Sequence, residues 1–288
     1  MSDPPVPPSS GPGTEPDAEV STEAYDRLLA LVRQRRSCRR FSDRAIPDGH
    51  LEKILEAARW AMSGANSQPW EFIVVRQPER IAALYRAYQE HINDLNFWLE
   101  QRFPYELRHP GFRLEGGIEE QYRRLQERPG WSVAPALIVV LGDGRRQLGS
   151  VSGASTPGRH QTHLTDALSN AGTLIHLAAG SLGLVTQWVS IHVQEPFKQL
   201  LGVPPLLTLH TIIPVGYPQQ PLTGIFRRKL SEIVHYDVYD EAKFMSNRQI
   251  VEYLFRLRSS TVRTYFRSRG ERYTQTPASE SEGGESSS

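Results

Sequence analysis

The segment Leu164–Leu182 constrains the fold of this chain more than any other, because it is almost entirely apolar at helical spacing. Its apolar positions cover most of the circumference of a helix, so that helix must be central or lie at a subunit interface. These positions are Ala167, Leu168, Ala171, Leu174, Ile175, Ala178 and Ala179. The length approaches the roughly 20 residues of a membrane span, but polar side chains interrupt it and no basic flank follows. Among them are Asn170, Thr173, His176 and Ser181. We predict a central helix of a soluble protein, with His176 as a satisfied core or interface histidine.

Four apolar runs predict strands around this helix: residues 71–75, 136–141, 184–191 and 209–216. The run 136–141 shows no alternation, so both of its faces should be covered. The run 71–75 is also expected to be a buried strand. Helical spacing predicts further helices over 24–33, after an N-cap at Asp48, from Pro78 and over 195–201. Because helical and strand patterns alternate along the chain, they belong to one folded unit.

The composition at both ends of the chain predicts disorder. Residues 1–21 are rich in Pro, Ser and Gly, and residues 274–288 are mostly Ser, Glu and Gly, so neither segment can offset its ordering entropy by burial. The folded unit therefore spans residues 22–273. It contains an aromatic excursion over 91–131, read either as a cover over a site or partner subunit or as plain surface packing. A helical extension over 241–268 suits an arm lying on a neighbour.

The charge balance excludes some classes of partner. The chain has 33 Lys and Arg against 32 Asp and Glu, a formal charge of +1, so no overall field would recruit nucleic acid or an anionic membrane. Cys38 is the single cysteine, and we see neither a secretory leader nor an apolar span long enough for a membrane. We expect a cytoplasmic protein.

The turn Trp60–Trp70 joins a helix to a strand through small and amide residues. Ser63, Asn66 and Gln68 can donate and accept hydrogen bonds, and Gly64 with Ala65 keeps the approach of a flat ligand open. Taken alone, such a segment is usually only a turn.

Two basic clusters, Arg35–Arg40 and Arg227–Lys229, could converge on one phosphate, because arginine forks bind phosphate oxygens in pairs. The alternative for the first cluster is a solvated charge run or a nuclear-type signal. No phosphate-loop glycine pattern and no nucleophile elbow is present. His160 and His163 have a spacing seen in metal sites, but no acidic or cysteine residue completes a ligand set, so we predict no metal.

Two motifs together resemble the amino-terminal signature of the FMN-dependent nitroreductase family: Arg35–Phe41 and Ala57–Trp70. The end of the central helix, Leu177–Leu184, and the basic segment Arg227–Val234 are similar to further family motifs. The resemblance spans nearly the whole folded region. It implies an α+β fold, with a mixed central sheet surrounded by helices, an apolar central helix and a carboxy-terminal arm. It also implies an intertwined homodimer with two FMN sites at the interface.

The same resemblance implies roles for particular residues. The ribityl chain, phosphate and pyrimidine edge of FMN would be held by Arg35, Ser37 and Arg39, with Arg36 nearby. Arg228, with Arg227, would close on the phosphate. Asn66 would meet the isoalloxazine edge, with Ser63 and Gln68 beside it and Met62 and Gly64 shaping the floor. Backbone groups at Val189 and Ser190 would face the reactive N5 of the flavin.

The implied activity is reduction of a nitroaromatic, quinone or similar conjugated acceptor with NAD(P)H, by ping-pong kinetics and without a catalytic side chain. Two departures keep alternatives open. Thr173-Leu174 stands where many members have Gln-Asn, and Trp188-Val189-Ser190 resembles a segment of flavin-fragmenting dimethylbenzimidazole synthases. The alternatives are flavin fragmentation, reductive dehalogenation, or, from another class, a non-catalytic flavin-binding interaction module.

Overall fold

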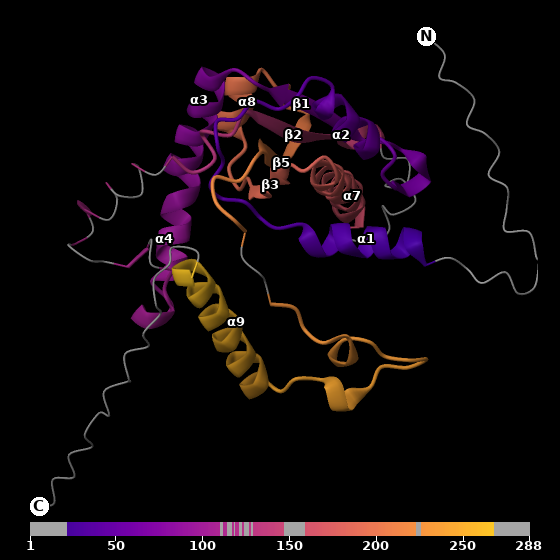
Figure 1. Cartoon of the computed structure of the whole chain (residues 1–288), viewed down its shortest axis with the longest axis vertical. Coiled ribbons are helices and arrows are strands. Elements are labelled where there is room, and N and C mark those ends of the chain that lie inside the picture. Colours follow the sequence, from indigo (N-terminus) through magenta and orange to yellow (C-terminus); the bar gives the residue numbers. More distant parts are fainter. Residues whose placement is uncertain are drawn as a thin grey trace, which may run out of the picture. The chain divides into compact units, whose positions relative to one another are not determined.

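The computed structural model describes residues 22–109, 129–146, 159–222 and 226–267, with isolated positions between 112 and 127 (Figure 1). The predicted tails 1–21 and 274–288 lie outside the described residues, as do residues 147–158 of the Gly- and Ser-rich loop. The contacts divide the chain into two units, Met1–Gln34 and Arg35–Ser288. In the first unit, the described part is the helix α1, Glu23–Gln34, which confirms the helix predicted over 24–33 and buries none of its residues.

The second unit is built on an antiparallel sheet. Its strands are β1 (Trp70–Val75), β2 (Ala136–Asp143), β3 (Val185–Thr186), β4 (Val189–Ser190) and β5 (Leu207–Gly216). The strand order is β1-β2-β5-β3, and β4 also pairs with β5. All of these pairs are antiparallel, whereas the isolated bridge between Ser37 and Thr186 is parallel. The predicted α+β class is confirmed. Among the described pairings, the bridge between Ser37 and Thr186 is the one that is parallel.

Helices cover both faces of this sheet (Figure 1). The covering helices are α3 (Pro78–Tyr88) and α8 (Glu195–Leu201) on one face and α2 (His50–Ala58) and α7 (Arg159–Ser181) on the other. Two further helices, α4 (Asp94–Glu100) and α9 (Asn247–Arg267), lie away from the strands (Figure 1). Short helical turns lie at Gly64–Asn66, Gln89–Asn93, Tyr105–Leu107, Gly144–Arg146, Leu230–Glu232 and Glu241–Lys243. No helix in the described part of the chain combines the length and hydropathy that crossing a membrane requires.

The strand β2 shows why the core has two halves. All of its residues are buried, as its unbroken apolar sequence predicts. Alternate side chains point to opposite faces: Leu137 and Val139 pack with α3 and α8, whereas Ile138 and Val140 pack with α2 and α7. Both α3 and α8 contribute to one apolar cluster and both α2 and α7 to the other. The apolar helix α7 is therefore central, as its sequence requires.

Three sequence-based expectations differ from the structure. The helix α2 begins after Gly49, whose φ of 77° is left-handed and turns the chain into the helix, so Asp48 is not the N-cap. The strand β1 lies at the edge of the sheet and leaves Val74 exposed, so it is not fully buried. The strand predicted over 184–191 is split into β3 and β4.

The break between β3 and β4 lies opposite Pro214 of β5. The Gln187 amide donates to the Pro214 carbonyl at 3.3 Å, but proline has no N–H with which to return the bond, so the regular ladder is interrupted there. The neighbouring Trp188 ring packs on α7, where a methyl group at Gly172 would approach it to 2.7 Å. The aromatic excursion is also less superficial than its sequence suggests, since Phe97 and Trp131 are fully buried.

Candidate functional site

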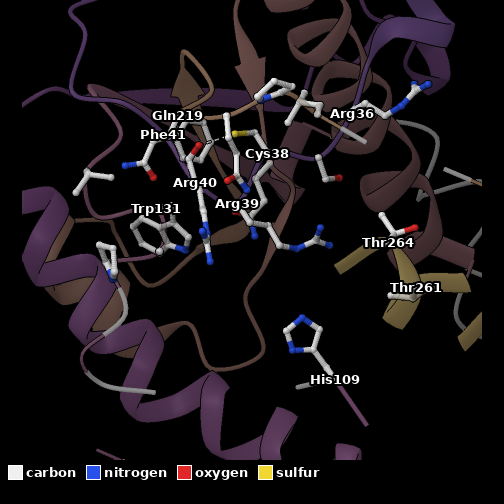
Figure 2. Close-up of a pocket in the computed structure, with 18 of the residues that line it drawn as sticks. Arg36, Cys38, Arg39, Arg40, Phe41, His109, Trp131, Gln219, Thr261 and Thr264 are labelled. Atoms are coloured by element: carbon white, nitrogen blue, oxygen red, sulfur yellow. Dashed lines mark hydrogen bonds between the residues drawn. The ribbon is translucent and has the colours of Figure 1, made fainter. Parts of the chain in front are cut away.

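A cavity of about 960 Å³ opens beside the first basic cluster (Figure 2). Its walls come from Arg36–Phe41, α3, the segment before β2, residues 219–222, residues 226 and 227, and the helix α9. The arginines that line it are Arg36, Arg39, Arg40, Arg227 and Arg258, and His109 also belongs to the wall. The aromatic ones are Phe41, Tyr85, Tyr88, Phe112, Trp131 and Phe226. No described residue that lines the cavity is acidic, so it is suited to a flat molecule that carries negative charge.

Backbone pairing holds the first basic cluster in place. The Cys38 amide donates to the Thr186 carbonyl at 2.9 Å, and Phe41 forms a bridge with Pro218. Cys38 and Phe41 are buried, while Arg39 and Arg40 are exposed and line the cavity. Burial also raises the pKa of the Cys38 thiol, so this cysteine is a core residue and not a reactive one.

The two basic clusters come together at Arg35 and Arg227. Burial lowers the pKa of Arg35, and the neighbouring charges of Arg227 and Arg36 lower it further. Arg228 lies differently: it donates to the Glu232 carbonyl at 2.8 Å, and its guanidinium lies 5.9 Å from the centre of the Tyr253 ring. The like charges of Arg35 and Arg227 repel one another, and an anion placed against them would relieve that repulsion.

The turn between α2 and β1 is held in an unusual conformation. Ala65, Asn66 and Gln68 all have a left-handed φ, of 54°, 51° and 43°. Such angles are uncommon outside glycine and cost free energy, so they often mark functional segments. The Ser63 hydroxyl accepts from the Gln68 amide at 3.0 Å, and Asn170 of α7 donates to the Met62 carbonyl at 3.1 Å. The turn is thus held by hydrogen bonds and leaves Asn66 and Gln68 exposed.

This turn does not line the cavity of its own chain. None of the three predicted polar residues, Ser63, Asn66 and Gln68, is among the lining residues. Val189 and Ser190 in β4 also lie outside the cavity wall, although the neighbouring Gln187 belongs to it. Arg35 and Arg228 are not lining residues either. Within one chain, the cavity wall therefore gathers Arg36, Ser37 and Arg39 with Arg227 and leaves Arg35, Arg228, the turn and β4 outside it.

The aromatic wall of the cavity was not identified from the sequence. Tyr85 and Tyr88 project from one side of α3, and the Trp131 ring meets them edge-on, with centroids 4.9 Å and 5.7 Å away. Gly130 allows this contact, because a methyl group there would lie 2.2 Å from the Tyr85 hydroxyl oxygen. The spacing of the two tyrosines places them on one helical face, but only the tertiary structure brings Trp131 to that face.

His176 of α7 is buried, as predicted. Its Nδ1 forms a hydrogen bond of 2.6 Å with the Thr186 hydroxyl. Burial lowers the pKa of His176 to about 4, and the charge of Arg35 acts in the same direction. The imidazole is therefore neutral in the folded protein at pH 7.

We expect this neutral histidine to make stability depend on pH. His176 is protonated near pH 6.5 in the unfolded chain but only near pH 4 in the folded chain. The stability that the neutral imidazole contributes is therefore fully present above pH 6.5. As the pH falls from 6.5 to 4, the free energy of unfolding decreases by at most about 3 kcal/mol. Urea unfolding of the wild type and His176→Gln over this range measures the difference. A loss of the same size in the variant would contradict the assignment.

The fold and a family model define the class of the protein. The chain superimposes on solved nitroreductase-like structures, among them an oxidized iodotyrosine deiodinase bound to FMN and 3-iodo-L-tyrosine. That likeness has a TM-score of 0.52 at 24% identity and covers 74% of this chain and all of the other. At this identity it establishes the fold alone. The model of the nitroreductase family matches residues 32–217, and the chain belongs to that family.

Two relatives of known name illustrate the range within the family. The chain is 29% identical over 198 residues to the "Putative NADH dehydrogenase/NAD(P)H nitroreductase" of Archaeoglobus fulgidus, with 67% of this chain and 87% of that protein covered. It is also 29% identical over 228 residues to the iodotyrosine deiodinase of Drosophila melanogaster, with 76% and 72% covered. The two names refer to different substrates, so membership of the family does not by itself identify the electron acceptor of this chain.

Proposed function

We propose that this protein is an FMN-dependent oxidoreductase that takes hydride from NAD(P)H and reduces a nitroaromatic, quinone or similar conjugated acceptor. The observation that carries the proposal is the approach of Arg35 to Arg227, because Arg227 lines a large aromatic cavity and an anion placed there would relieve the repulsion between the two charges. Membership of the nitroreductase family and the name of the A. fulgidus relative support it.

The residues present fit FMN. Arg35, Arg227 and Arg39 would hold its phosphate and ribityl oxygens, because no carboxylate among the described residues forms an ion pair with any of the three. Ser37 would add a hydroxyl, while Arg36 and Arg228 would flank the phosphate. The aromatic wall of Tyr88 and Trp131 would exclude water from the face of a conjugated ligand.

A second copy of the chain completes the proposed site. Ser63, Asn66 and Gln68 do not line the cavity of their own chain, yet their strained turn projects from the surface. We propose that the turn of one protomer meets the isoalloxazine edge in its partner, where the Asn66 amide can satisfy a ring N–H and a carbonyl together. The backbone at Val189 and Ser190 would then lie toward N5. A homodimer is therefore part of the proposal.

Bound FMN would supply the two-electron chemistry that none of the side chains in this site can provide. For a quinone, NAD(P)H and one proton give the hydroquinone and NAD(P)⁺. The chain itself binds the anionic parts of the cofactor, orients its ring and shields the reacting faces. No protein acid or base has to act in these steps.

A second candidate is reductive dehalogenation, which the similarity to the iodotyrosine deiodinases favours. An iodinated aromatic and NAD(P)H would give the deiodinated aromatic, iodide and NAD(P)⁺. Both candidates need the same cofactor, so they differ only in the acceptor that the cavity admits.

Anaerobic titration of the purified protein tests the proposal. We expect a yellow protein whose flavin is bleached by NADH or NADPH and reoxidised by menadione or a nitroaromatic. Flavin that stays oxidised with both nicotinamides would refute the enzymatic reading, and a colourless protein that FMN cannot reconstitute would refute the cofactor. Iodide release from an iodophenol would favour the second candidate. A benzimidazole formed in oxygen would instead indicate flavin fragmentation.

A further inference from the structure

Trp131 presents a buried hydrogen-bond donor that nothing satisfies. The residue is 2% exposed, and its indole Nε1 has no hydrogen-bond partner among the described residues. A buried donor without a partner costs roughly 1–3 kcal/mol, so such groups are rare unless a ligand uses them. Trp131 lines the cavity, and Figure 2 shows its ring at the cavity wall. A ligand with an acceptor oxygen would satisfy this group.

Arg40 presents a charge to the same cavity. Its carbonyl accepts hydrogen bonds from the Cys38 thiol at 3.1 Å and from the Gln219 amide at 3.0 Å, so its backbone is held from both sides. Its side chain points into the cavity (Figure 2). In the part of the chain that the structure describes, no carboxylate pairs with Arg40, and no acidic side chain lines the cavity. The guanidinium is therefore available to an anion.

The neighbouring surfaces restrict what kind of anion can enter. Tyr85 and Tyr88 stack with rings 6.2 Å apart, and both meet the edge of the Trp131 ring. These rings offer apolar surface to a flat, conjugated body, while Arg40 and the indole N–H offer two donors to an oxygen at its rim. The three hydroxyl residues of α9 on the cavity wall are Ser260, Thr261 and Thr264. They add polar contacts without negative charge.

We propose that Arg40 and Trp131 form an anion subsite, so that the acceptor reduced in this cavity is a conjugated molecule bearing a carboxylate or a similar oxyanion. This inference rests on the proposed oxidoreductase function and adds the substrate class to it. The oxyanion accepts from the Arg40 guanidinium and from the Trp131 indole N–H. The body of the molecule lies against the tyrosines. In this proposal Arg40 binds the electron acceptor, whereas Arg35, Ser37 and Arg39 bind the cofactor.

Two nitroaromatics of nearly equal size test the subsite with the FMN-loaded protein. The first is 4-nitrobenzoate, which is anionic, and the second is 4-nitrobenzamide, which is neutral. The ratio of their kcat/KM values is compared between variants, because each compound's intrinsic ease of reduction then cancels. Arg40→Gln is expected to lower the ratio about tenfold, as for loss of one charge-assisted hydrogen bond. The change should appear in KM for the benzoate.

The control is Arg44→Gln, which removes the same charge four residues away. Arg44 lies over the Tyr217 ring and does not line the cavity, so the ratio should stay as in the wild type. Trp131→Phe removes the indole N–H and retains an aromatic ring, and should lower the ratio severalfold. A ratio that is unchanged in Arg40→Gln, or equally lowered in Arg44→Gln, would overturn the proposal.

Two further measurements separate this inference from the proposed function. FMN occupancy of Arg40→Gln is expected to equal that of the wild type, and loss of flavin would place Arg40 in the cofactor site and overturn the subsite. If the protein shows no turnover at all, calorimetric titration of the full chain with 4-nitrobenzoate and with 4-nitrobenzamide still tests whether the subsite exists. Tighter binding of the benzoate than of the benzamide, lost in Arg40→Gln, supports the subsite. Equal binding of the two compounds contradicts it.

Discussion

Replacing Arg35 by glutamine is expected to weaken FMN binding about 10- to 100-fold, through loss of one or two charge-assisted hydrogen bonds to phosphate. Arg35 is half-buried and lies close enough to Arg227 for the two charges to affect one another. Arg227→Gln should have a similar effect. Arg228→Gln should have a smaller one, because its guanidinium also has Glu232 as a partner, with Nε 3.6 Å from the carboxylate. Release of fluorescent FMN on dilution measures each affinity.

A second consequence of the Arg35 substitution checks that the variant remains folded. The charge of Arg35 contributes to the low pKa of His176, so Arg35→Gln should raise that pKa, which NMR titration of the imidazole can follow. Arg76→Gln is the matched control, since Arg76 is an exposed arginine outside the cavity wall. Wild-type FMN affinity in both Arg35→Gln and Arg227→Gln would contradict the cofactor assignment.

Breaking the ion pair between Arg258 and Glu100 is expected to release α9. Because the pair is mostly buried, removing one partner should cost about 3–5 kcal/mol of stability. Arg258 also donates to the Leu107 carbonyl at 2.6 Å and lies 4.8 Å from the centre of the Phe103 ring. Glu100 also accepts from the His109 amide at 2.8 Å. One carboxylate therefore joins α4, α9 and a cavity-lining residue.

The variants Arg258→Met and Glu100→Gln should lose hydrogen-exchange protection in α9, while β2 and β5 keep theirs. The double variant Arg258→Met/Glu100→Leu should recover part of the loss, because it leaves no unpaired buried charge. Arg248→Met removes an exposed pair with Glu252 on the same helix and should cost less than 1 kcal/mol. Undiminished protection of α9 in Arg258→Met would show that other contacts hold the helix.

Local patterns in the sequence were sufficient for most of the fold. The unbroken apolar run of β2, the central helix α7 and the helix α8, which the left-handed Gly202 ends, all follow from residue type and spacing. They are predictable because burial on two faces, helical periodicity and a left-handed C-cap are properties of short segments. The failures occur at Asp48 and in the strand predicted over 184–191, where a left-handed glycine and a proline on the neighbouring strand override the local pattern.

The candidate site likewise has parts that the sequence indicated and parts that only the structure revealed. The arginine motif and the strained turn were recognisable as unusual segments, and their proposed roles remain predictions. Trp131 and Arg40 were visible in the sequence only as one scattered aromatic and one more basic residue. Their joint presence in a single cavity depends on β2, α3 and the bridge to Pro218, which are far apart along the chain.

The sequence by itself determined the secondary structure of the core, the α+β class and the family, because each rests on local propensity or on a contiguous motif. Only the tertiary structure decided which side chains share a cavity. It brought Arg227 to Arg35, set the Tyr85 and Tyr88 face against Trp131, and kept the Asn66 turn out of its own chain's cavity. The physical reason is that pairing across the sheet and packing on its two faces fix distances between residues remote in sequence, which no local pattern encodes.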